Sequence, residues 1–486
     1  MATNNLVAKI WSFCDTLRDD GLGYGDYLEQ LTYLLFLKMA DENRNQYNLP
    51  KGCDWQSILK SGQIIVAYEE LLKKLSVSGG MLSKIFSGAQ NKIHDSIKLK
   101  KLINLIDGEN WTSQDVDIKG EIYESLLQKN AENSGAGQYF TPRSVISTMV
   151  SCIKPNSLET IADPSCGTGG FFLGALLHLN NKPLTDEETS FLKFNTFHGW
   201  EIEKSTARLC LMNLFLHGIG DLKETPNIEV TDSLKRGDNG EVNEEEKVDV
   251  VLANPPFGVT SSDIPTIDIE QSKKDGYFLR KDFWVTTSNK QLAFLQHIVA
   301  MLKVNGRAAV VLPDNVLFEG GAGETIRKRL MNETDLHTIL RLPTGIFYAQ
   351  GVKANVLFFD KRRDSKTPAT KEIWYYDYRT NISHTPKKNP LKYEDLKEFV
   401  ELYNSDDRSK RKETWSNENP DGRWKKYSHA DILAKDKTSL DIFWLRNDNI
   451  LDLENLPDPV VLAQEIIDNV DAALESFRGV ALKLED

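Results

Sequence analysis

The chain of 486 residues is poor in cysteine, and its cysteines form no cross-linking or metal-binding pattern. It has five, and no two of them are separated by only two residues. Small secreted domains that depend on disulfides carry many more, and structural zinc sites usually pair their cysteines as CxxC. The length is sufficient to bury a large apolar core without such cross-links. We therefore expect neither a disulfide scaffold nor a structural zinc site.

Long apolar runs, a signal peptide and an excess of positive charge are also lacking. No stretch of about 18 apolar residues is present, so we expect no membrane span. The opening MATNNLVAKIW has no basic region followed by an apolar segment, which favours a cytoplasmic protein. The net charge of −12 argues against a chain that coats nucleic acid unaided. The negative net charge is compatible with a local basic groove or a basic partner subunit, because nucleic-acid binding depends on how the charges are distributed over the surface.

The pattern of apolar residues predicts three parts. The run YLEQLTYLLFLKMADEN from Tyr27 repeats apolar residues at helical spacing, and we expect an amphipathic helix there, within a helical domain over residues 1–133. Residues 134–395 alternate strand-like and helical runs, which favours an α/β domain with a mostly parallel sheet covered on both faces. Residues 396–486 are expected to form a C-terminal extension that ends in an acidic amphipathic helix. The expected strands of the central part are 158–163, 195–202, 247–256, 306–313, 336–343 and 355–361, and its expected helices are 143–153, 170–181, 206–218, 291–302 and 324–333.

The first candidate site is the tetrapeptide Asn254-Pro255-Pro256-Phe257, which directly follows the apolar run VDVVLA. Two consecutive prolines cannot continue a central strand, so the chain must turn out of the sheet there. The carboxamide oxygen of Asn254 and the carbonyl oxygen of Pro255 are hydrogen-bond acceptors. Two acceptors beside the flat ring of Phe257 suit a planar amino group such as that of adenine or cytosine. The competing interpretation is a rigid turn that merely ends a strand.

Such an amino group is a poor nucleophile because its lone pair is delocalised into the ring. When two acceptors bind the hydrogens of the amino group, its nitrogen is favoured in a pyramidal geometry, which is the geometry it adopts as it attacks. No strong base is then required beforehand, which agrees with a motif that contains no His, Asp or Glu.

The second candidate is a glycine-rich loop, DPSCGTGGF, which runs from Asp163 to Phe171 between an expected strand and an expected helix. It is neither a P-loop, since no Lys-Ser or Lys-Thr follows the last glycine, nor a GxGxxG dinucleotide motif. Close backbone approach at its glycines suits a nucleoside with a compact polar tail, such as a methionine group. An ordinary loop between strand and helix is the alternative.

Two carboxylates follow the next strand-like runs. Glu201 in GWEI could accept both hydroxyls of a ribose, as the acidic residue of dinucleotide-binding folds does. Asp232 in VTDSL could accept from the amino group of a cofactor's adenine. Each could equally be a solvated surface carboxylate. The four elements in this order nevertheless predict a nucleoside cofactor beside an amino-group substrate.

Together these motifs resemble the modification (M) subunits of type I restriction-modification systems, which are N6-adenine DNA methyltransferases. The resemblance covers nearly the whole chain, including LFLKMADEN (35–43), GQYFTP (137–142), residues 340–359 and residues 423–445. It implies a Rossmann-like S-adenosylmethionine-dependent methyltransferase sheet with an N-terminal helical domain and a C-terminal helical extension. It implies no metal, and it implies catalytic roles for Asn254, Pro255, Pro256 and Phe257. The residues it implies for binding S-adenosylmethionine are Gln138, Tyr139, Phe140, Thr141, Pro142, Arg143, Asp163, Cys166, Gly167, Thr168, Gly169, Gly170, Glu201 and Asp232.

The resemblance also implies a mechanism and partners. The target adenine would leave double-stranded DNA and stack on Phe257, and direct displacement would move the methyl group. A separate specificity (S) subunit would read the sequence, with two M per S, and a restriction (R) subunit would join them in the full complex. The acidic C-terminal helix would dock on S or simply cap its own domain. The basic stretches 409–412 and 423–426 could follow DNA phosphates or be solvated surface.

Three alternatives stay open at this point. NPPF-type motifs also occur in enzymes that methylate glutamine amides of proteins, because both substrates present a planar nitrogen. A solitary adenine methyltransferase is the second alternative. The third is a cofactor-binding scaffold that serves mainly in assembly, although an intact Asn254 and Phe257 argue against it.

Overall fold

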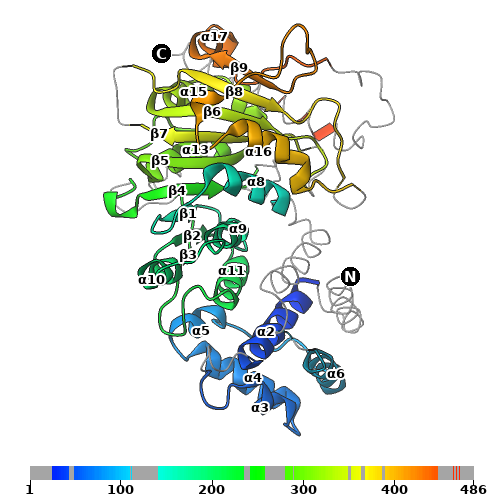
Figure 1. Cartoon of the computed structure of the whole chain (residues 1–486). Helices are drawn as coiled ribbons and strands as arrows, with labels where there is room; N and C mark the ends of the chain where they lie inside the picture. Colours follow the sequence, from blue (N-terminus) through cyan, green and yellow to red (C-terminus); the bar gives the residue numbers. More distant parts are fainter. Residues whose placement is uncertain are drawn as a thin grey trace. The chain divides into compact units, whose positions relative to one another are not determined.

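The chain is described by a computed structural model, in which two compact units are distinguished (Figure 1). The first unit comprises Met1–Phe140, Cys166–Leu173 and Leu184–Val230, and the second comprises Thr141–Ser165, Gly174–Pro183 and Thr231–Asp486. The expected division at residues 133/134 and 395/396 stays a prediction. The structure describes residues 24–42, 49–109, 111, 141–234, 241–257, 280–287, 289–347, 352–362, 367–385 and 389–446, and in addition residues 463, 464, 467 and 470.

The helices of the first unit pack around one almost fully buried helix, α2 (Tyr24–Glu42). Its apolar positions are in the core as expected, but the expected polar face is not exposed: Lys38 and Asp41 are also buried. A helix surrounded on all sides must satisfy its polar groups internally. Lys38 does so with Asp107 at 2.8 Å and Glu42 at 3.3 Å. The surrounding helices are α3 (Trp55–Leu59), α4 (Ile64–Ser76), α5 (Gly80–Ile85) and α6 (Ser96–Asp107).

The first unit also contains part of the α/β region. Its two strands, β2 (Phe197–Glu201) and β3 (Asn227–Val230), pair in parallel and are joined through α11 (Lys204–Leu216); α10 (Asp186–Phe194) precedes them. In α11, the guanidinium of Arg208 donates to Glu29 and Tyr33 of α2 and, at 2.8 Å, to the carbonyl of Ser87. The N-terminal helices are therefore tied to the helix that follows the strand ending in Glu201.

The sheet of the second unit is mixed rather than mostly parallel. Its strands lie in the order β1-β4-β5-β7-β6-β8-β9. The pairs β1·β4, β4·β5 and β6·β8 are parallel, whereas β7 is antiparallel to both β5 and β6 and β9 is antiparallel to β8. Residues 342–353 connect β6 to β7, and the two strands pair in the antiparallel sense. The bounds are β1 (Ile161–Asp163), β4 (Val248–Ala253), β5 (Leu302–Pro313), β6 (Thr334–Arg341), β7 (Ala354–Lys361), β8 (Glu372–Asp377) and β9 (Trp424–Ser428).

Helices cover both faces of this sheet, with α8 and α16 on one face and α13 and α15 on the other (Figure 1). Close contact between α8 and α9 depends on Gly174, because a Cβ there would lie 2.5 Å from Cγ2 of Ile146. No helix within the described ranges has the length and apolar character needed to cross a membrane. The helices are α8 (Arg143–Ile153), α9 (Gly170–Leu179), α13 (Lys290–Met301), α14 (Asn315–Phe318), α15 (Ala322–Glu333), α16 (Lys397–Tyr403) and α17 (His429–Leu433).

The two basic stretches considered as phosphate contacts are largely used within the second unit. Arg411 is buried and donates to the carbonyl of Tyr403 at 2.6 Å and to Thr338 at 3.0 Å. The ammonium of Lys425 lies 3.1 Å from the centroid of the Trp415 ring, and Lys426 pairs with Glu372 at 2.8 Å. These contacts favour a structural role over DNA binding for much of both stretches.

Next to Arg411 a histidine is buried among charged groups. His337 Nε2 lies 3.6 Å from Asp360 Oδ1, and Arg408 contacts the same carboxylate at 2.5 Å. Burial lowers the pKa of His337 to about 3; Asp360 opposes this shift, and the Arg408 and Arg411 guanidiniums add to it. The folded chain therefore keeps this imidazole neutral over a pH range in which an ordinary histidine is protonated.

This burial predicts acid-sensitive stability. Between about pH 6.5 and pH 3 the unfolded chain binds a proton at His337 that the folded chain does not, so the free energy of unfolding decreases as the pH falls, by roughly 1.4 kcal/mol per pH unit. We expect H337Q to lose about 2 kcal/mol less than the parent chain between pH 7 and pH 5 in urea unfolding. H94Q, at an exposed histidine, is the control. An H337Q variant with the parent's pH dependence would contradict the prediction.

Candidate active site

The Asn-Pro-Pro-Phe motif directly follows the buried strand β4. Asn254 and Phe257 are 8% and 7% exposed, so both motif side chains are enclosed. The Nδ2 of Asn254 donates to Oγ1 of Thr141 at 2.8 Å. Ser165 Oγ donates to the carbonyl of Asn254 at 3.4 Å, and Asp163 Oδ1 accepts from the Ser165 N–H at 2.9 Å. The second unit thus brings together Thr141, Asp163 and Asn254.

The ring of Phe257 has an aromatic neighbour that sequence reasoning did not single out. Its centroid lies 5.9 Å from that of Phe347, with the planes 75° apart in an edge-to-face arrangement. Phe347 follows β6, in the stretch LPTGIF, and is buried. The only signal in the sequence was an aromatic residue shortly after a strand end. The motif side of the site therefore carries two rings rather than one.

In the first unit, Glu201 and the glycine-rich loop are joined directly. The N–H of Gly167 donates to Oε2 of Glu201 at 3.0 Å, and the N–H of Glu203 donates to Oε1 at 2.8 Å. Burial raises the pKa of Glu201, although backbone donors oppose this shift. Gly167 and Gly169 have φ of +54° and +85°, a region that favours glycine. Each carboxylate oxygen has a second lone pair, so Glu201 can hold the loop and still accept from hydroxyl groups.

Two of the predicted cofactor residues, Cys166 and Asp232, belong to different units of the chain. Cys166 is buried, and a Cβ at Gly199 of β2 would come 2.9 Å from its Sγ, so the thiol packs against the strand. Asp232 lies in the second unit, where its carboxylate accepts from the N–H of Leu234 at 3.0 Å. In the rest of the loop, the carbonyl of Thr168 accepts from Asn213 at 2.9 Å. Gln138, Tyr139 and Phe140 lie outside the described residues.

The start of α8 has the properties of an anion site. Its N-cap is Pro142, which makes no side-chain cap, and Arg143 is exposed in the first turn. Ser144 is 8% exposed, and its Oγ has no hydrogen-bond partner among the described residues. Helix N-termini attract anions through their unsatisfied N–H groups and the helix dipole. In the second unit these residues fit the carboxylate of an amino-acid tail, and in the first unit Glu201 fits a ribose. Each fit matches one part of S-adenosylmethionine.

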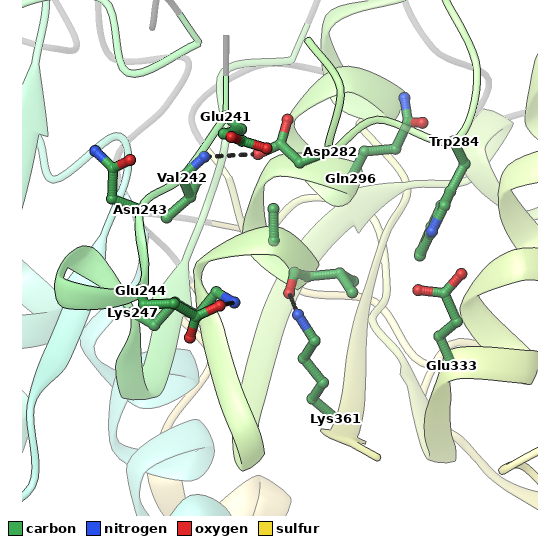
Figure 2. A pocket seen from close by; sticks show the side chains of 12 residues that line it. Glu241, Val242, Asn243, Glu244, Lys247, Asp282, Trp284, Gln296, Glu333 and Lys361 are labelled. Carbon is green, nitrogen blue, oxygen red and sulfur yellow. Dashed lines mark hydrogen bonds and ion pairs between the residues drawn. The ribbon is translucent and has the colours of Figure 1, made fainter. Parts of the chain in front are cut away.

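A separate cavity of about 390 Å³ lies at the beginning of β4 rather than at its end (Figure 2). Six strand residues, or about 20 Å, separate its Lys247 from Asn254. Two of the charged groups at this cavity make local contacts: Lys361 Nζ donates to the carbonyl of Val299 at 2.8 Å, and Asp282 accepts from the N–H of Val242 at 2.9 Å. None of the predicted site residues lines it.

Comparison with known proteins agrees with the geometry of the motifs. A family model for N-6 DNA methylases matches residues 114–436, and one for the HsdM N-terminal domain matches residues 6–106. The chain belongs to the N-6 DNA methylase family. It is 39% identical to the type I restriction enzyme StySJI methylase subunit of Salmonella typhimurium, over 100% of this chain and 96% of that protein.

Solved structures give the same result. The chain superposes on the type I restriction enzyme EcoKI M protein with a TM-score of 0.55 and 34% identity, covering 99% of this chain and 96% of that one. A chain from a study of complex assembly and conformational transition in a type I restriction-modification system gives a TM-score of 0.72 and 27% identity, with 99% and 98% covered. As a family member, the chain is a type I methylase subunit and an adenine-specific DNA methyltransferase that uses S-adenosylmethionine. The solitary enzyme and the glutamine methyltransferase are not favoured.

The geometry around Glu201 yields a binding prediction. Replacement by glutamine removes the charge from an acceptor that holds Gly167, and hydrogen bonds to charged groups contribute roughly 1.5–3 kcal/mol. We expect E201Q to weaken S-adenosylmethionine binding about 10- to 100-fold in calorimetry. E203Q changes an exposed carboxylate at the N-cap of α11, two residues after Glu201, and should bind normally. Equal affinity of E201Q and the parent chain would remove Glu201 from the cofactor site.

Proposed function

We propose that methyl transfer takes place at the end of β4, where Asn254 and the carbonyl of Pro255 accept the two hydrogens of the adenine amino group. The observation that carries this proposal is the buried Asn254 carboxamide, whose Nδ2 is held by Thr141 at 2.8 Å. With the nitrogen end held there, the oxygen end lies on the other side of the amide, as an acceptor of the substrate amino group requires.

The target base must leave the DNA stack to reach these acceptors, at a cost of a few kcal/mol. We propose that Phe257 stacks on the extruded adenine and that Phe347, in edge-to-face contact with Phe257, supports that ring. Aromatic contact replaces part of the stacking that the base loses in the duplex. The residues thereby act through positioning, which is the main requirement of a direct displacement.

S-adenosylmethionine supplies a methyl group already activated on a sulfonium. We assign the first turn of α8, with Ser144, to its carboxylate, and Glu201 to its ribose hydroxyls. Asp232 is assigned to its adenine amino group, and the backbone at Gly167 and Gly169 to close approach. Gln138, Tyr139 and Phe140 retain the cofactor role that the resemblance implies. No assigned step requires a metal.

Type I methylase subunits work with specificity and restriction subunits on DNA. We propose that two copies of this chain bind one specificity subunit, which selects the DNA site. The acidic C-terminal segment is the proposed docking element. Apart from residues 463, 464, 467 and 470, the segment from residue 447 onward lies outside the described residues. Its support is its composition: residues 431–486 contain 13 acidic and 5 basic side chains.

Substitution of the motif asparagine separates catalysis from cofactor binding. N254A removes the acceptor for the adenine amino group, and we expect methyl transfer to DNA to fall at least about 100-fold. Affinity for S-adenosylmethionine, measured by calorimetry, should stay within a factor of about two. N227A, at an exposed asparagine at the start of β3, is the control. Parallel loss of binding and transfer would count against the assignment.

Truncation tests the docking segment. A chain ending before residue 455 should lose co-elution with the specificity subunit in gel filtration, while its S-adenosylmethionine affinity is retained. Normal co-elution of the shortened chain would show that the segment does not dock on that partner.

A further inference from the structure

The hydrogen bond between Thr141 and Asn254 gives Thr141 a role different from the cofactor contact that the resemblance implies. Both side chains are 8% exposed, and their bond is buried and 2.8 Å long. The residues are 113 positions apart, so the contact exists only because the start of α8 lies at the end of β4. Enclosed bonds of this kind are electrostatically stronger than exposed ones.

Helix α8 holds Thr141 in a fixed place relative to the sheet. At its C-terminal end, Arg307 of β5 donates to the carbonyls of Ile153 and Lys154, both at 2.9 Å. Near its N-terminal end, Ile146 packs against Gly174 so closely that no side chain fits between them. The helix cannot shift along the sheet without breaking these contacts, and Thr141 therefore presents its hydroxyl from a rigid support.

The carboxamide of Asn254 needs such a support. The terminal torsion of asparagine is broad and roughly two-fold, so the side chain alone does not decide whether nitrogen or oxygen faces a ligand. With Nδ2 donating to Thr141, Oδ1 is directed to the other side. As the adenine nitrogen attacks, its hydrogens become more acidic and draw electron density onto Oδ1. The Nδ2–H group then becomes a better donor, so the bond to Thr141 strengthens as the reaction proceeds.

We propose that Thr141 is a positioning residue that orients the Asn254 carboxamide and stabilises its polarised form during methyl transfer. This inference rests on the proposed function of Asn254. It predicts that loss of the Thr141 hydroxyl lowers kcat, because the bond is strongest when the amine attacks, and leaves cofactor binding nearly unchanged.

The test compares T141V, T141S and T148V as full chains with the specificity subunit, in transfer of tritium from labelled S-adenosylmethionine to DNA. T141V removes the hydroxyl at nearly constant volume and leaves the buried Nδ2–H without its acceptor, so we expect kcat to fall about ten-fold or more. T141S restores the hydroxyl and should recover most of the parent kcat. T148V is the matched control, because Thr148 is a buried threonine of the same helix whose hydroxyl donates to the carbonyl of Ser144 at 2.8 Å. It should keep the parent kcat.

The outcomes distinguish the possible failures. If T141V raises the Kd for S-adenosylmethionine and keeps kcat at saturation, Thr141 contacts the cofactor and the positioning role is wrong. If T141S is as slow as T141V, or T148V is equally slow, the effect is one of packing and the proposal is also overturned. If the parent chain transfers no label to DNA while N254A binds S-adenosylmethionine normally, the proposed function itself fails, independently of Thr141.

Discussion

Two adjacent prolines at the end of a buried strand are the constraint on which this site depends. Strand β4 is enclosed along nearly its whole length, and Pro255 and Pro256 forbid its continuation. The chain must leave the sheet at Asn254, which places a carboxamide in the core at the end of the strand, where it is 8% exposed. A polar group at such a position is costly unless it is hydrogen-bonded, and Thr141 supplies the partner. The same turn places Phe257 against Phe347.

The residues of the glycine-rich loop are divided between the two compact units of the chain. Asp163 and Ser165 belong to the unit that contains Asn254, whereas Cys166 and the glycines belong to the unit that contains Glu201. Within the latter, Arg208 connects the helix after Glu201 to α2 of the N-terminal helices. The N-terminal helices and the proposed ribose carboxylate are thus parts of one packed body.

Strong local patterns allowed much of the fold to be predicted. The run VDVVLA before two prolines and the spacing of glycines after Asp163 identified β4, β1 and α9, because burial and backbone geometry act over a few residues. Strands β8 and β9 were missed: Lys425 and Lys426 make β9 look like surface, although Trp424 is buried in it. The polar side of α2 was expected in solvent and is buried, since neighbours outside the helix provide its partners. The Thr141–Asn254 bond could not be predicted either, because no local rule pairs residues 113 positions apart.

We propose that this chain, an adenine-specific DNA methyltransferase, acts at DNA sites chosen by another subunit. The most direct measurement is tritium transfer from labelled S-adenosylmethionine to double-stranded DNA, with and without the specificity subunit, followed by identification of the labelled base. The account predicts label in N6-methyladenine only when the specificity subunit is present. Label incorporated by this chain alone would contradict the division of labour, and label found in protein rather than DNA would contradict the assigned substrate.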